Sequence, residues 1–297
     1  MNKIICLLFI ALSYTASAQT IDEKPKILYG VCTKESLVKE PFGNWYKPNY
    51  DSYQPDVATT AFLKKQNYDN ISIKIFFGTW CGDSKREVPR FLKLLSEISF
   101  PEKKMQLIAL GGSDSLLKQS PLHEEAGLGI FRVPTFIIYK NGIEINRINE
   151  FPVFSLEKDM VNILNNQLYV PNYHSFSSVL KWINEGTLTD DNISTRGLAE
   201  QVRPLVSTEN ELNSLGYLLL KQKKKKEGLR LFQINYSLYP ESYNIASSLG
   251  EGYYENGDYK KAVTQLEKSL ELNKDPKAIK EILAILYKAK GKEAESK

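Results

Sequence analysis

The stretch Ile71-Ser-Ile-Lys-Ile-Phe-Phe-Gly-Thr-Trp80-Cys81-Gly-Asp-Ser-Lys-Arg-Glu-Val-Pro89 decides the fold of this chain. Its first half alternates β-branched and aromatic residues and ends at Gly78, which is typical of a buried strand. Its second half turns polar after Cys81, which is typical of the first turn of a surface helix. We therefore expect Cys81 to lie where a strand passes into a helix.

A cysteine at this position is expected to be reactive. The first backbone N–H groups of a helix have no partners within the helix, and the helix dipole favours a negative charge beside them. A thiol held there loses its proton more readily than a free thiol, and the thiolate is the nucleophilic form. Among the neighbours, Asp83 opposes that negative charge, whereas Lys85 and Arg86 favour it.

Two motifs resemble those of the thioredoxin-like family. Trp80-Cys81-Gly82, with Lys85 and Pro89 after it, resembles the family's active site. The segment Arg132-Val-Pro-Thr-Phe-Ile-Ile-Tyr-Lys-Asn-Gly142 resembles the family's cis-proline strand and the Asn-Gly hairpin that follows it. The resemblance implies an α/β thioredoxin-like domain, with a central mixed sheet and helices on both faces.

The resemblance also implies a set of site residues. Cys81 would be the catalytic nucleophile, and the hydroxyl of Ser84 would donate a hydrogen bond to its thiolate. Trp80 would shield the sulfur, and Pro134 would present a backbone edge to the client chain. The expected substrate-binding residues are Trp80, Gly82, Asp83, Val133, Pro134 and Thr135.

The chain departs from the dithiol members of that family at two positions. Ser84 stands where they carry a second cysteine, and Ile75 stands where they carry a buried acid. A mixed disulfide can form on Cys81, but its release then needs an outside thiol, a cysteine of the client, or Cys32. Cys32 is thus a candidate resolving thiol or, alternatively, a small buried hydrophobe. His123 is either a surface residue or a further group at the site.

Residues 1–18 have the features of a signal peptide. Lys3 is followed by the short apolar run Ile4–Leu12 and by Ala16-Ser17-Ala18, so the mature chain is expected to begin at Gln19. The apolar run is shorter than the roughly 20 residues of a membrane span. We therefore expect an exported protein without a membrane span, in the periplasm or another extracytoplasmic compartment that permits disulfides.

Composition and motifs argue against other classes of function. The formal net charge of +4 is too mild to indicate nucleic-acid binding, and 42% hydrophobic residues are typical of a globular protein. No pair of cysteines or histidines has the spacing of metal ligands, and no glycine-rich phosphate loop is present. We expect no cofactor and no metal.

The length of 297 residues suggests about two domains. Residues 19–55 form an N-terminal extension, in which Lys26–Val31 is a candidate strand. Its aromatic stretch Phe42–Pro55 is expected to be an ordered loop, either a lid or peptide-binding surface at the thiol or a segment packed on the sheet edge. Residues 56–170 form the thioredoxin-like domain. The elements expected there are helices at Val57–Lys65, Asp83–Ile98 and from Ser155, strands at Ile71–Phe77, Met105–Leu110, Pro134–Lys140 and Ile143–Ile148, and an irregular or helical insert at 113–130.

The rest of the chain is expected to be all-helical. A connector at 171–205 would hold a short helix at Phe176–Ile183. Residues 206–297 contain a repeat with a period of 34 residues, in which Leu215-Gly216 recurs as Leu249-Gly250, and this pattern resembles tetratricopeptide repeats. A last helix, Pro276–Lys290, would cap the stack. Such repeats bind protein partners on a concave surface; alternatively, they are a prop for the first domain.

Two functions from different classes follow from these features. The first is an exported thiol–disulfide exchange protein, of the monothiol oxidoreductase or isomerase type, that acts on protein clients with thiols or disulfides through Cys81. Its repeats would recruit a client or partner. The second is a redox-silent thioredoxin-like binding or adaptor protein. The retained cysteine favours the first, and the missing partner thiol and buried acid favour the second.

Overall fold

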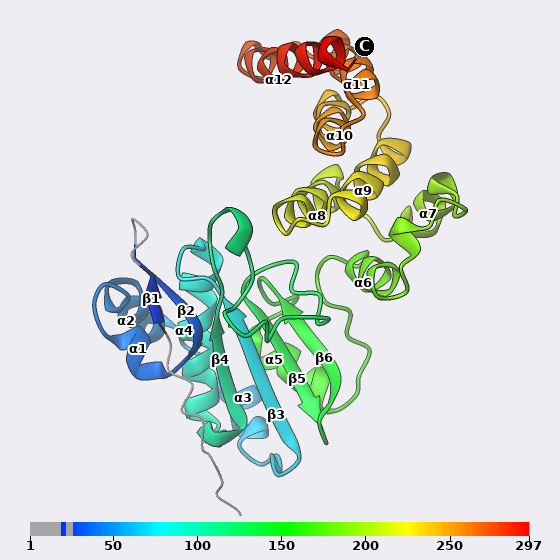
Figure 1. Cartoon of the computed structure of the whole chain (residues 1–297). Helices are drawn as coiled ribbons and strands as arrows, with labels where there is room; N and C mark the ends of the chain where they lie inside the picture. The colour runs from blue at the N-terminus through cyan, green and yellow to red at the C-terminus, as the bar shows by residue number, and fades with distance from the viewer. Residues whose placement is uncertain (1–18, 22–25, 297) are drawn as a thin grey trace, which may run out of the picture.

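The chain forms an α/β domain followed by an all-helical region that extends away from it (Figure 1). The structure is a computed structural model and describes residues 19–21 and 26–296. The expected signal peptide, residues 1–18, lies outside the described residues. No helix in the described part of the chain combines the length and the apolar character of a membrane span.

The α/β domain is built on one mixed sheet with the strand order β1-β2-β4-β3-β5-β6. Strands β3 and β4 are parallel, and all other neighbours are antiparallel. The β5–β6 hairpin turns at Asn141 and Gly142, which both have positive φ, so this expected turn is confirmed. The strands are β1 (Gln19–Ile21), β2 (Ile27–Cys32), β3 (Ile71–Phe77), β4 (Met105–Ala109), β5 (Thr135–Lys140) and β6 (Ile143–Asn149).

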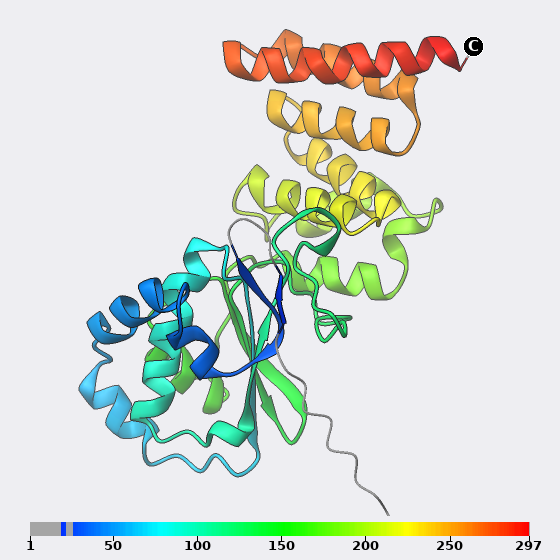
Figure 2. The same cartoon turned by 60° about the vertical axis from the view of Figure 1, so that its left-hand side comes forward.

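Helices cover one face of this sheet, as Figure 2 shows for the side that carries α1, α2 and α4. The apolar face of α4 packs there, with Val88, Phe91 and Leu94 fully buried. The helices are α1 (Lys34–Val38), α2 (Gly43–Ser52), α3 (Val57–Leu63), α4 (Gly82–Glu97) and α5 (Leu156–Leu164), with a 3₁₀ turn η1 (Glu102–Lys104) before β4.

The expectation of helices on both faces needs correction. The buried cluster on the second face takes its residues from strands, from the segments that directly follow β3 and β4, and from loop residues 128–133. The insert between β4 and β5 is irregular apart from a 3₁₀ turn, η2 (Asp114–Leu116). Its sequence has no sustained apolar period of 3.6 residues, so no helix forms to cover that face.

The expectation for Phe42–Pro55 was also wrong. Most of this segment is helix α2, despite Pro48 in its interior, and it packs against α4 instead of forming a loop at the thiol or the sheet edge. Tyr46 and Tyr50 lie one helical turn apart, and their rings stack at 5.6 Å. Burial of this aromatic face outweighs the backbone hydrogen bond that proline removes.

Glu157, in the first turn of α5, ties the N-terminal extension to the domain. Its carboxylate accepts hydrogen bonds from the Tyr53 hydroxyl and the Asp56 amide, both at 2.7 Å. Burial alone would raise the pKa of this carboxyl, but the donors around it outweigh burial and hold the pKa below its usual value. The paired carboxylate is therefore a pH-dependent source of stability.

The all-helical region begins earlier than the repeat. The expected connector contains a second helix, α7, and its apolar residues share one core with those of α6 and α8. Two helix pairs, α8–α9 and α10–α11, follow at the expected period, and α12 runs five residues beyond its expected end at Lys290. The helices are α6 (Phe176–Asn184), α7 (Thr195–Val202), α8 (Glu209–Lys221), α9 (Lys225–Leu238), α10 (Tyr243–Glu255), α11 (Tyr259–Leu272) and α12 (Pro276–Glu295), with the 3₁₀ turn η3 (Thr187–Thr189).

The two parts of the chain meet through specific contacts. The Arg132 guanidinium donates a hydrogen bond to the Ser214 hydroxyl of α8 at 2.8 Å. The ring of Phe131 packs edge-on against Phe176 of α6 at 5.3 Å. Since Arg132 and Phe131 directly precede Val133, the helical region contacts the segment that leads into β5.

We expect replacement of Glu157 by Gln to lower stability only where the carboxylate is ionised. The amide cannot accept both hydrogen bonds, so the free energy of unfolding at pH 7 should fall by about 1–2 kcal/mol. Because the folded-state pKa lies below the unfolded one, this contribution is present above about pH 4.3 and is lost as the pH falls through the folded value. Urea unfolding across pH 3–7 measures it; an equal difference at pH 3 and pH 7 would contradict this account.

We expect replacement of Gly216 by Ala to separate the first helix pair. A Cβ at this position would overlap the Phe232 ring of α9, and the backbones cannot then approach as closely. Thermal and urea unfolding should show a loss of about 1–3 kcal/mol. Gly291→Ala in α12 is the matched control, since nothing lies within 4 Å of a Cβ there. The explanation fails if both variants have the same stability.

Candidate active site

Cys81 is the residue that precedes the first turn of α4. Its backbone is extended, with φ −90° and ψ 130°, and its carbonyl accepts the first helical hydrogen bond, from the Lys85 amide at 3.0 Å. The side chain is partly exposed, and its sulfur lies 3.2 Å from the Val133 carbonyl oxygen. The expected placement of Cys81 between a strand and a helix is confirmed.

The loop opposite the thiol contains a cis peptide and is fixed by two hydrogen bonds. The Val133–Pro134 peptide is cis. The Thr135 hydroxyl donates to the Arg132 carbonyl at 2.7 Å, and the Glu150 amide donates to the Pro134 carbonyl at 2.7 Å. The side chains of Val133 and Thr135 are buried, so these two residues can reach a client only through their backbone.

Trp80 is fixed beside the thiol by its ring nitrogen and by two glycines. Its Nε1 donates to the Leu110 carbonyl at 3.0 Å. A Cβ on Gly78 or on Gly112 would come within 2.5 Å of ring atoms of Trp80, so both positions require glycine. The ring thus packs between the ends of β3 and β4, in the same small core as Cys81.

The hydrogen bond expected between the Ser84 hydroxyl and the Cys81 sulfur is not found, and the structure gives Ser84 another contact. Its side chain is fully buried, and its hydroxyl accepts a hydrogen bond from the Gly78 amide at 3.1 Å. The Cys81 thiol itself donates a hydrogen bond to the Val133 carbonyl. Ser84 therefore joins the start of α4 to the end of β3, because a small hydroxyl fits the enclosed space behind the turn.

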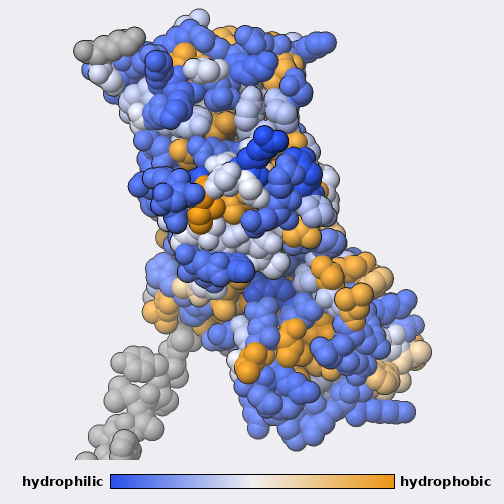
Figure 3. All heavy atoms as spheres, turned by 90° about the vertical axis from the view of Figure 1, so that its right-hand side faces the viewer, coloured by the Kyte–Doolittle hydropathy of each residue, from blue (hydrophilic) through white to orange (hydrophobic). Residues whose placement is uncertain are grey.

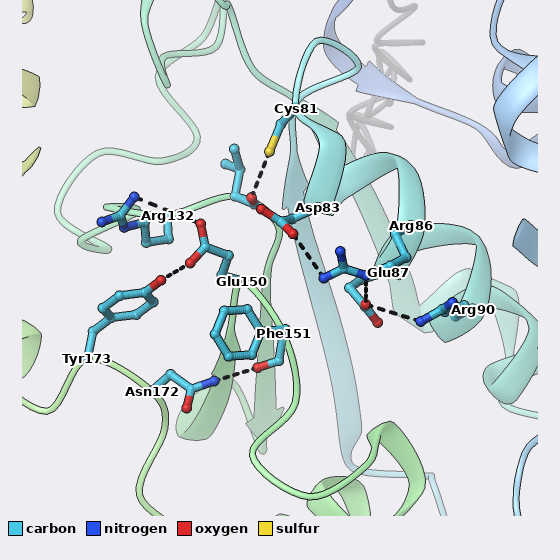
Figure 4. Close-up of polar contacts among 11 residues, drawn as sticks. Cys81, Asp83, Arg86, Glu87, Arg90, Arg132, Glu150, Phe151, Asn172 and Tyr173 are labelled. Atoms are coloured by element: carbon cyan, nitrogen blue, oxygen red, sulfur yellow. Dashed lines mark hydrogen bonds and ion pairs between the residues drawn. The ribbon is translucent and has the colours of Figure 1, made fainter. Parts of the chain in front are cut away.

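Charged side chains flank the thiol on two sides, as Figure 4 shows. On the α4 side, Asp83 and Arg86 form an ion pair at 2.9 Å, so their opposing effects on a thiolate partly cancel. Arg86 also contacts the buried carboxylate of Glu87 at 2.5 Å. Gly82 is exposed, and nothing lies within 4 Å of a Cβ there.

On the side of the thiol away from α4 lies a cluster of charged and aromatic side chains that the sequence did not predict. The Arg132 guanidinium lies 3.9 Å from the Glu150 carboxylate and 4.9 Å from the centre of the Tyr173 ring. Glu150 also accepts a hydrogen bond from the Tyr173 hydroxyl. Burial raises the pKa of Glu150 more than Arg132 lowers it. Lys118, from the insert, interacts electrostatically with Arg132, Glu150 and Cys81.

Cys32 is not placed to resolve a disulfide on Cys81. Its side chain is buried in the core on the helix-covered face of the sheet, whereas Cys81 packs against the core on the opposite face. Both cysteines are free, and burial raises the pKa of Cys32 to about 12. The reading of Cys32 as a small buried hydrophobe fits this position, and the role of resolving thiol does not.

His123 lies on the insert surface, 64% exposed and 3.2 Å from Glu125. No interaction of His123 with the thiol is found, so the interpretation of His123 as a surface residue fits its position. Within the described residues, no group of three or more His, Cys, Asp or Glu side chains is arranged to hold a metal ion. The site therefore consists of one accessible thiol, a backbone loop opposite it, and charged groups on both sides.

Replacement of Gly112 by Ala is expected to displace Trp80. The new methyl group would collide with the indole ring, which can move only by losing the hydrogen bond to Leu110. We expect a loss of about 1–3 kcal/mol in urea unfolding. Gly82→Ala, where the space is open, should be neutral or stabilising by up to about 1 kcal/mol. Equal stability of the Gly112→Ala variant and the wild type would refute the packing argument.

Comparison with known proteins adds no constraint on this site. The sequence matches no protein-family model and no curated protein. Inference about its function therefore rests on the geometry of Cys81 and its neighbours.

Proposed function

We propose that this chain is an exported thiol–disulfide exchange protein with a thioredoxin-like domain, acting on protein clients through the single thiol of Cys81. One observation carries the proposal. The sulfur is partly exposed at the start of α4 and faces the backbone of the Pro134 loop at 3.2 Å. Thiols at helix N-termini are typical nucleophiles of exchange reactions, and a client chain can approach this sulfur from its exposed side.

The reaction is a nucleophilic exchange. The Cys81 thiolate attacks one sulfur of a client disulfide, a new S–S bond forms, and the second client sulfur leaves as a thiolate. A second thiolate, from the client itself or from a small-molecule thiol, then attacks the mixed disulfide and releases Cys81 unchanged. The first route isomerises a disulfide with no net change in oxidation. The second, after a further small-molecule thiol attacks, reduces the client disulfide and oxidises two thiols.

Apolar side chains beside the Pro134 loop support a polypeptide client. The segment after Glu150 exposes Phe151, Val153 and Phe154, with 40%, 38% and 66% of their surface accessible. Figure 3 shows hydrophobic patches over the α/β domain on the face that carries β6. Scattered exposed apolar residues are ordinary, but a group beside a reactive thiol favours binding of an unfolded or extended chain.

We assign the outer helices to a protein partner. Figures 1 and 2 place α10, α11 and α12 farthest from the sheet. Helix pairs with a 34-residue period, as in tetratricopeptide-like repeats, present surfaces that bind proteins. The first pair has a second role as a prop, since α8 contacts Arg132. Export is inferred from residues 1–18 and supplies the oxidising compartment that the exchange reaction needs.

Trapping of mixed disulfides in the native compartment tests this function. The protein is isolated without reductant after rapid acid quenching, and covalent adducts are separated before and after reduction. We expect adducts with other proteins that are absent from the Cys81→Ala variant and unchanged in the Cys32→Ala variant. The buried Cys32 thus supplies a matched control.

Absence of Cys81-dependent adducts, together with normal folding and retained partners on the helical region, would favour the second candidate. In that case the chain is a redox-silent adaptor, and the position of Cys32 on the opposite face of the sheet supports this reading. Both functions allow the wild type and the Cys81→Ala variant to co-purify the same partners through the helical region, so the presence or absence of disulfide-linked adducts distinguishes the two.

A further inference from the structure

Lys118 occupies an unusual place beside the thiol site. It lies on the insert between β4 and β5, and its backbone has φ +54°, in the left-handed region that non-glycine residues rarely adopt. The Lys118 amide donates to the Gly111 carbonyl at 2.9 Å, which closes a short loop. Gly112 of that loop contacts the Trp80 ring. The strained loop thus packs directly on the residue next to Cys81.

The amine of Lys118 points toward the same segment as the sulfur. Its Nζ donates to the Phe131 carbonyl at 2.6 Å, and the Cys81 sulfur contacts the carbonyl of Val133, two residues further on. An ammonium group has three donor hydrogens, and Phe131 accepts one of them. The cation is therefore fixed to the loop that faces the thiol, although Lys118 lies 37 residues from Cys81 in the chain.

A buried cation needs negative charge nearby to offset its loss of hydration. Burial, and to a smaller extent Arg132, lower the pKa of Lys118 to about 8, while Glu150 and Cys81 act in the opposite direction. The other charged groups around Glu150 are Asp83 and Arg86. Glu150 is already shared with Arg132 and the Tyr173 hydroxyl. Besides Glu150, Cys81 is the other group whose negative charge would stabilise the Lys118 ammonium.

We propose that Lys118 is a positioning residue whose positive charge stabilises the Cys81 thiolate, an inference that rests on the proposed exchange function. In this arrangement the insert supplies the positive charge, and the charged residues around Lys118 determine how strongly that charge stabilises the thiolate. Arg132 and Glu150 interact with the same positive charge, and Arg132 also contacts α8. A neutral side chain at position 118 should leave the fold intact and make the thiol less acidic.

The rate of Cys81 alkylation by iodoacetamide between pH 5 and 10 tests this inference. All variants carry Cys32→Ala, so that Cys81 is the one thiol after residue 18. We expect Lys118→Met to raise the midpoint of the alkylation profile by about one pH unit. Lys118→Arg keeps the charge and should stay near the wild-type midpoint. Lys103→Met, at an exposed lysine beyond the opposite end of the sheet, is the matched control and should change nothing.

Disulfide exchange should follow the same order. A one-unit rise lowers the thiolate fraction at pH 6 about tenfold, and the higher intrinsic nucleophilicity of the less acidic thiol recovers about threefold. Exchange with a model disulfide should thus slow about threefold in Lys118→Met and recover in Lys118→Arg. An unchanged midpoint in a folded Lys118→Met variant would overturn the inference. A wild-type midpoint at or above about 8.5 would instead count against the exchange function.

A reciprocal measurement covers the case in which position 118 does not tolerate Met. Coupling between two titrating groups is mutual, so loss of the sulfur must change the titration of the lysine. The pKa of Lys118, followed by NMR of ¹³C-labelled lysine, should fall further in the Cys81→Ala variant than in the wild type. An identical Lys118 titration in both proteins would also overturn the inference.

Discussion

The contact between the Cys81 sulfur and the Val133 carbonyl is the constraint on which the rest of the site depends. It requires α4 to start shortly after β3, so that the thiol lies just beyond the end of this central strand. It also requires the segment before β5 to return to the same end of the strands. The pairing of β3 with both β4 and β5 satisfies these requirements, because it places the two segments side by side.

The charged side chains drawn beside this contact in Figure 4 come from three separate stretches of the chain. The start of α4 supplies Asp83 and Arg86, the segment around Pro134 supplies Arg132, and the end of β6 supplies Glu150. Arg132 contacts Ser214 as well, so the first repeat helix lies next to the site instead of being attached through a free linker. The helical region thus supports the site and, through its outer helices, offers a surface for a partner.

Local patterns predicted the parts of the fold that depend on neighbouring residues. The alternation in Ile71–Phe77, the polar turn after Cys81 and the Asn141-Gly142 hairpin each specify their own backbone, and all three are found. The 34-residue period likewise predicted the two helix pairs, because each repeat unit specifies its own pair of helices. Helix α2 was missed because Pro48 argues against a helix, whereas burial against α4 decides it.

Long-range juxtapositions could not be predicted in the same way. Lys118 sits in an insert without periodicity, and its relation to Cys81 arises only when that insert folds back over β4. The resemblance implied that Ser84 is a partner of the thiol, whereas the hydrogen bond found for its hydroxyl comes from the Gly78 amide. Cys32 takes the helix-covered face because side chains alternate along β2 and its partner in the register is Leu107, which belongs to the same core. Cys81 lies beyond the end of β3 and packs against the core on the other face.

The most direct test of the central claim is the reaction of the reduced protein with an aromatic disulfide at pH 6, where ordinary thiols are almost entirely protonated. The wild-type chain should release one equivalent of aromatic thiol, and should do so faster than free cysteine in the same buffer. We expect the reaction to be lost in the Cys81→Ala variant and to be unchanged in the Cys32→Ala variant. A reaction slower than that of free cysteine, or none, would contradict the account of Cys81 as an accessible nucleophile.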